Sequence, residues 1–149
     1  MTGVARSEWG MTPRQSIEAE CGRRGRPAVV RGCVALLERR DVDPELIVAL
    51  GGPPARWALD GGGRGGPDYW LRVWATRGLL WAWDDSAGPA VLRALDDEAW
   101  RVREMAVKVL AHHGVGEALQ PIAALGSDPS SRVRTAAARA LARLTVSRA

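Results

Sequence analysis

The second half of the 149-residue chain contains three nine-residue segments that align without gaps: LRVWATRGL (Leu71–Leu79), VREMAVKVL (Val102–Leu110) and VRTAAARAL (Val133–Leu141). They start at residues 71, 102 and 133, which is a period of 31 residues. At four of the nine aligned positions, or columns, all three segments have the same residue or a similar one. These columns are Leu71, Val102 and Val133; Arg72, Arg103 and Arg134; Ala75, Ala106 and Ala137; and Leu79, Leu110 and Leu141. Such a period predicts a stack of similar helical units.

Each segment has the apolar spacing of one helix face. Apolar residues recur at i, i+4 and i+8, and the alanine among them lets a neighbouring helix approach closely. A partner helix is predicted directly before each of the last two segments, at residues 89–95 and 117–125. No run shows the strict alternation of a half-buried strand. We therefore predict an all-α fold of antiparallel helix pairs.

An aspartate precedes the arginine by six residues in the last two repeats, as Asp97 before Arg103 and Asp128 before Arg134. Both aspartates lie where the second helix starts, so that a carboxylate meets the positive helix end. Together with the alanine and leucine columns, this pattern resembles the HEAT repeat, in the short variety named after phycobilisome lyases. The resemblance implies a right-handed α-solenoid, a HEAT-like superhelix, in which these Asp and Arg residues form a structural ladder between neighbouring repeats.

The resemblance covers about residues 68–144, and the preceding part of the chain lacks the period. The first repeat departs from the pattern because Gly66 stands where the aspartate is expected. We predict one domain over residues 1–149, with capping helices or degenerate repeats in 1–60, a glycine-rich connector in 61–66 and HEAT-like repeats in 67–149. Helices are expected near residues 13–21, 27–40, 46–50, 68–83, 89–95, 99–113, 117–125 and 129–146, with a brief segment at 55–60.

The outward positions of the repeated helices form a column of basic residues. Counting about 100° per residue from Val102, the outward column contains Arg77, Lys108 and Arg139. In such stacks this side usually forms the concave binding surface. Further residues predicted to bind the partner lie beside the column: Trp70, Arg101, Arg132 and Arg143. The alternative is a solvated helix face in an arginine-rich protein.

The charge of the chain agrees with an anionic partner. The net charge is +4 and the pI about 10.0, with no acidic residue after Asp128. We predict a non-catalytic binding or scaffold module that holds a protein partner, with an acidic surface, on its concave face. The alternative is a DNA- or RNA-binding protein that uses Arg77, Lys108 and Arg139. A further alternative is a lyase-like or other enzyme, which follows only from the name of the repeat variety.

Neither catalytic residues nor sites for a metal or cofactor are predicted. The chain has two cysteines, Cys21 and Cys33, and no CxxC spacing. The N-terminal residues do not resemble a signal peptide, and the apolar runs are too short or interrupted to cross a membrane. These features favour a cytoplasmic protein without a membrane anchor.

Two local motifs allow more than one interpretation. Arg24–Pro27 (RGRP) matches the core of the AT-hook, which binds the minor groove of AT-rich DNA, but it also suits a turn between two helices. Five of the seven tryptophans lie between Trp70 and Trp100, with Trp70, Trp74 and Trp81 along one helix edge. They are predicted either to fill the joint before the first repeat or to line a stacking groove beside Arg77.

Overall fold

The computed structural model describes residues 10–59 and 68–148 of the chain. These residues form α-helices and short 3-10 helices and contain no strand, which confirms the prediction of an all-α fold. The helices pair as in a HEAT-like solenoid, while the handedness remains a prediction. No helix among them is long and apolar enough to cross a membrane.

The chain divides into two compact units between Asp84 and Asp85. The predicted glycine-rich connector at residues 61–66 lies outside the described residues. The helix that carries the first repeat segment belongs to the first unit because it packs on the N-terminal helices.

The first unit contains five helices: α1 (Pro13–Arg24), α2 (Arg26–Leu37), α3 (Pro44–Gly51), α4 (Pro53–Leu59) and α5 (Tyr69–Gly78). Helix α5 packs against α2 and α3, and α1 packs against the same two helices. The core between them holds fully or almost fully buried apolar side chains, among them Ile17, Val29, Cys33, Leu50 and Leu79.

Side-chain caps set the boundaries of α1 and α3. The hydroxyl of Thr12 accepts the amide of Gln15 (3.1 Å), and the Gln15 side chain accepts the amide of Thr12 (3.0 Å). This reciprocal pair of hydrogen bonds is a capping box. Asp43 accepts the amide of Leu46 (2.9 Å) in the same way at α3. Gly25 separates α1 from α2 with φ of 87°, a conformation that favours glycine.

Helix α5 is shorter than predicted. It ends at Gly78, although the apolar pattern predicted a helix to residue 83. After Gly78 the backbone hydrogen bonds join residues three apart, as in a 3-10 turn. The amide of Leu79 donates to the carbonyl of Thr76 (3.0 Å), and the amide of Leu80 donates to the carbonyl of Arg77 (3.0 Å). The later apolar residues therefore belong to a turn.

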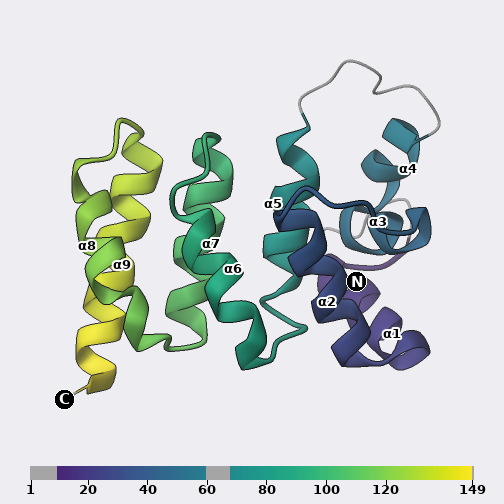
Figure 1. The fold of residues 1–149 in the computed structure, drawn as a ribbon, viewed down its shortest axis with the longest axis horizontal. Coiled ribbons are helices and arrows are strands. Elements are labelled where there is room, and N and C mark those ends of the chain that lie inside the picture. The colour runs from purple at the N-terminus through teal and green to yellow at the C-terminus, as the bar shows by residue number, and fades with distance from the viewer. Residues whose placement is uncertain (1–9, 60–67, 149) are drawn as a thin grey trace. The chain divides into compact units, whose positions relative to one another are not determined.

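The second unit consists of two helix pairs, α6 (Gly88–Ala94) with α7 (Trp100–His112) and α8 (Leu119–Ala124) with α9 (Ser131–Arg148). Short 3-10 helices precede α6 and α8, and a third follows α8. Helices α7 and α9 also pack against each other and lie side by side in Figure 1. Most positions of the predicted apolar columns are buried in this unit: Val102, Ala106, Leu110, Val133 and Ala137 are all 0% exposed, whereas Leu141 is partly exposed.

Candidate binding groove

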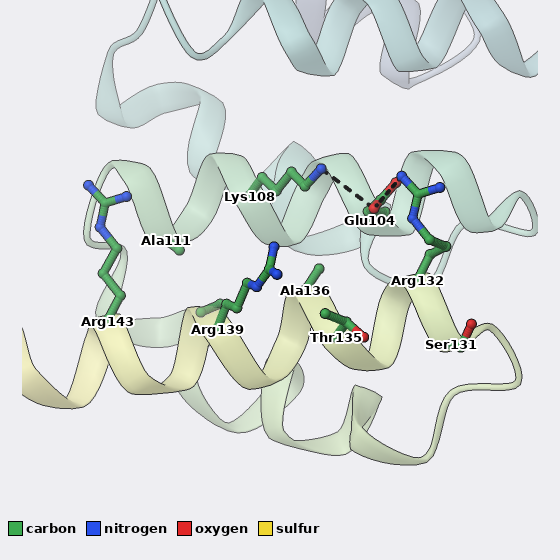
Figure 2. A pocket seen from close by; sticks show the side chains of 10 residues that line it. Glu104, Lys108, Ala111, Ser131, Arg132, Thr135, Ala136, Arg139 and Arg143 are labelled. Atoms are coloured by element: carbon green, nitrogen blue, oxygen red, sulfur yellow. Dashed lines mark ion pairs between the residues drawn. The ribbon is translucent and has the colours of Figure 1, made fainter.

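A groove runs between α7 and α9 in the second unit (Figure 2). Its volume is about 400 Å³. The bottom is made of small side chains, with Ala111, Ala136 and Ala140 each buried. Because alanines leave room where two helices meet, the longer side chains around them border an open channel. The charged residues that line it are Glu104, Lys108, Arg132, Arg139 and Arg143.

Helix periodicity brings these charged side chains together. Glu104 and Lys108 are one turn apart on α7, as are Arg139 and Arg143 on α9. The groove therefore combines four cations with one carboxylate. Lys108, Arg139, Arg132 and Arg143 were predicted from the sequence as partner-binding residues, and the structure places all four around this one groove.

The single carboxylate lies at one end of the groove, among partners from both helices. One oxygen of Glu104 is 3.5 Å from the Lys108 ammonium and 3.3 Å from the Arg132 guanidinium. The Glu104 side chain is 13% exposed, whereas those of Lys108 and Arg132 are 50% and 65% exposed. The Arg132 guanidinium also lies 5.6 Å from the centre of the Trp100 ring. These contacts link α7 and α9 at one end of the groove.

The other end of the groove has a different charge balance. Arg139 and Arg143 are both exposed. Within the described residues, neither has an ion-pair partner. Figure 2 shows the two ion pairs converging on Glu104, with Arg143 at the far end from Arg132. The charge is therefore unbalanced along the groove: Glu104 offsets Lys108 and Arg132 at one end, Arg143 lies at the other, and Arg139 lies between them (Figure 2).

Among the predicted Asp and Arg residues, Arg103 and Asp128 join the two helix pairs. The Arg103 guanidinium donates two bonds to the Asp128 carboxylate, at 2.8 Å from Nε and 3.0 Å from Nη2. Its third nitrogen donates to the carbonyl of Asp97 (2.8 Å). Arg134 repeats that last contact one repeat later, donating to the carbonyl of Asp128 (2.7 Å). Hydrogen bonds from Arg103 lower the pKa of the buried Asp128 carboxyl below its usual range.

Because Arg103 lies on α7 and Asp128 lies just before α9, this pair fixes the spacing of the two helices that form the groove. The bidentate geometry is directional as well as charged, so it restrains rotation of one helix against the other.

Arg77 occupies a different environment from the one predicted. It belongs to the first unit, where its guanidinium donates to the carbonyl of Leu50 at the C-terminal end of α3 (2.8 Å). Its Nε is buried and has no hydrogen-bond partner among the described atoms. Burial lowers the pKa of this guanidinium. We correct the prediction accordingly: Arg77 is half-buried and anchors α5 to α3, instead of pointing outward.

Two other predicted partner-binding residues, Trp70 and Arg101, are not among the residues that line the groove. Trp70 belongs to α5 in the first unit, is 37% exposed and stacks on Trp74 with 6.3 Å between ring centres. Trp74 in turn lies so close to Gly51 that any added side chain there would overlap its ring. The Arg101 guanidinium lies 4.4 Å from the centre of the Trp100 ring.

The RGRP motif is the turn between α1 and α2, which confirms the simpler of its two interpretations. Arg24 forms ion pairs with the Glu20 carboxylate and with Asp43 (2.7 Å). An AT-hook needs its arginines free to enter the minor groove, and this arginine is held by two carboxylates.

No group of three or more His, Cys, Asp or Glu side chains that could hold a metal ion occurs in the part of the chain that the structure describes.

Glu104 is the residue whose role the sequence pattern missed. Its spacing from Lys108 signals a possible pair within α7. The second contact, to Arg132, depends on how α7 and α9 pack and has no signal in the sequence.

The comparison with protein families agrees with the repeat. The family model for HEAT repeats matches residues 64–147, more than half of the chain. The chain belongs to the HEAT-repeat family. No protein of curated function matches it. HEAT repeats generally mediate protein–protein interaction or scaffolding and are typically not enzymes.

Proposed function

We propose that this protein is a binding module that holds an acidic segment of a protein partner in the groove between α7 and α9. The observation that carries the proposal is the pair of exposed arginines, Arg139 and Arg143, one turn apart on the α9 wall of the groove. Guanidinium groups bind carboxylates with two parallel hydrogen bonds, and arginine is enriched at the centres of protein interfaces.

The groove also supplies a surface on which a peptide can lie. Its alanine bottom is apolar and its rim is charged, so a bound segment can bury small apolar side chains while its acidic residues reach the rim. Arg103 already binds Asp128 with a bidentate contact in the same unit, which illustrates the chemistry that we propose for Arg139 and Arg143.

A nucleic-acid partner is the second candidate, and the pI of about 10.0 favours it. Nucleic-acid binding would require several phosphate contacts along the face and a steep dependence on salt. The groove instead contains a carboxylate beside two of its four cations, which leaves few positions for phosphates. We therefore place the acidic protein segment first.

The proposal is tested by titrating a fluorescent peptide into the full chain. The peptide carries two glutamates about four residues apart. Replacing Arg139 and Arg143 together by glutamate should weaken its binding by about tenfold or more, because each lost charged contact at an interface costs about 1 kcal/mol or more. Fluorescence anisotropy at constant ionic strength measures the change.

The matched control reverses two exposed arginines of the first unit, Arg31 and Arg56. This variant has the same net charge as the groove variant, so a general charge effect would weaken both equally. Equal weakening, or unchanged binding by the groove variant, would remove the groove from consideration. Circular dichroism should show the same helix content in all three proteins.

A further inference from the structure

The position of Glu104 raises a question that the proposed function leaves open. A groove for anions would gain affinity from four free cations, yet a carboxylate lies among them. Glu104 contacts Lys108 from the same helix and Arg132 from the neighbouring one, at 3.5 and 3.3 Å. The Glu104 side chain is only 13% exposed, so its carboxylate is held between these two cations, whose own side chains remain 50% and 65% exposed.

This carboxylate has opposite effects at the two ends of the groove. It partly neutralises Lys108 and Arg132 and leaves Arg139 and Arg143 without an acidic partner among the described residues. An anion approaching Lys108 and Arg132 would also approach Glu104 and be repelled. An anion that contacts only Arg139 and Arg143 would avoid most of that repulsion.

We propose that Glu104 is a specificity residue that selects a protein segment with sparse carboxylates and excludes continuous polyanions from the groove. The inference rests on the proposed function and specifies how the negative charges are spaced along the partner segment. The preferred segment has two carboxylates about 6 Å apart, the spacing of side chains one helical turn apart. It needs no acidic residue opposite Glu104.

Charge spacing provides the physical basis for this selection. Duplex DNA carries one negative charge per about 1.7 Å of its axis, so a duplex that lies along the groove brings a phosphate close to the Glu104 carboxylate. A peptide can place a neutral residue there. Interfaces commonly gain specificity from a repulsive element of this kind, at some loss of affinity for every anion.

The experiment compares Glu104→Gln with the wild-type chain, using a duplex DNA of about 20 base pairs and the two-glutamate peptide as probes. Glutamine has nearly the same shape but no charge. At about 50 mM salt, we expect the variant to bind the duplex about tenfold more tightly, and its affinity should fall more steeply as salt is added, because Lys108 and Arg132 become available to phosphates. Peptide affinity should change by less than about twofold.

Glu117→Gln is the matched control. Glu117 is an exposed acidic residue of the same unit and does not line the groove. It changes the net charge equally and should alter duplex binding by less than about twofold. If the two variants strengthen duplex binding equally, or if Glu104→Gln leaves it unchanged, the specificity role is wrong.

The two proposals fail in different ways. Loss of peptide binding in the Arg139 and Arg143 variant tests the groove itself, whereas the duplex measurement tests Glu104 alone. A wild-type chain that binds the duplex tightly and the peptide not at all would overturn both. Circular dichroism of Glu104→Gln should match that of the wild type.

Discussion

The contact between Arg103 and Asp128 is the most informative single interaction in the second unit. Both side chains are largely removed from water, at 15% and 4% exposed, and they share two hydrogen bonds. Asp128 also accepts the amide of Ser130 (2.8 Å), which orders the start of the next helix. A buried pair of this kind adds little over an apolar contact, but the removal of one partner leaves an unpaired charge.

We therefore predict that Asp128→Asn lowers the free energy of unfolding by about 3 kcal/mol. Arg103 would keep its charge without the carboxylate that balances it. Urea denaturation followed by circular dichroism measures the loss. Asp41→Asn, an exposed site, is the control and should change stability by less than about 0.5 kcal/mol. A similar small effect at Asp128 would contradict the role given to the pair.

The pKa of Asp128 gives the same prediction a pH dependence. In the folded chain this pKa lies below its ordinary value of 3.8 because Arg103 donates hydrogen bonds to the carboxylate. The stabilisation is therefore complete above pH 3.8 and is lost as the pH falls through the lower, folded pKa. The difference in stability between the wild type and Asp128→Asn should shrink over this acidic range and stay constant above it.

At the scale of the elements, close packing explains how α5 is held against α2 and α3. An added Cβ at Gly78 would lie 2.7 Å from a methyl group of Leu50 and 3.3 Å from the sulfur of Cys33. Both neighbours are buried and have little room to move. The absence of a side chain at Gly78 thus sets the distance between these helices.

Gly78→Ala should lower the free energy of unfolding by about 1–2 kcal/mol, because the overlap outweighs the better helix propensity of alanine. The matched change is Gly22→Ala in α1, where an added Cβ meets nothing within 4 Å. That variant should gain up to about 1 kcal/mol. Thermal unfolding of both proteins tests the pair of expectations, and a stabilised Gly78→Ala would refute this account of the packing.

Most of the helices and their buried faces are predictable from the sequence, because the repeated residues mark equivalent positions in successive helices. The buried seam of α7 and α9 follows from columns such as Val102 and Val133, and the capping box at Thr12 is a local signal. The end of α5 was predicted wrongly, since the apolar residues after Gly78 continue the helical pattern while forming a turn. Local spacing cannot distinguish these two uses of an apolar residue.

The candidate site was predictable only in part. The repeat brings Lys108 and Arg139 to the same face, because equivalent positions of stacked helices align. Arg77 holds the equivalent column position, but its surroundings differ: the end of α3 offers a free backbone carbonyl, and Arg77 donates to it. The contact of Glu104 with Arg132 joins two helices, so no pattern within one helix reveals it.

At the scale of the whole molecule, the charge is spread unevenly along the chain. A net charge of +4 is modest, yet residues 129–149 contain five arginines and no acidic residue. Three of these arginines border the groove, namely Arg132, Arg139 and Arg143. A binding module that uses this surface needs only the second unit to contact its partner, while the first unit supplies a separately packed core.

The most direct test of this account is an amide-resolved NMR titration of the full chain with the two-glutamate peptide. We predict that the amides that shift belong to the groove walls, Glu104 to Ala111 on α7 and Ser131 to Arg143 on α9, and that added salt reverses the shifts. Shifts confined to the helices of the first unit, or none at peptide concentrations that saturate the fluorescence signal, would contradict the claim that the groove binds an acidic segment.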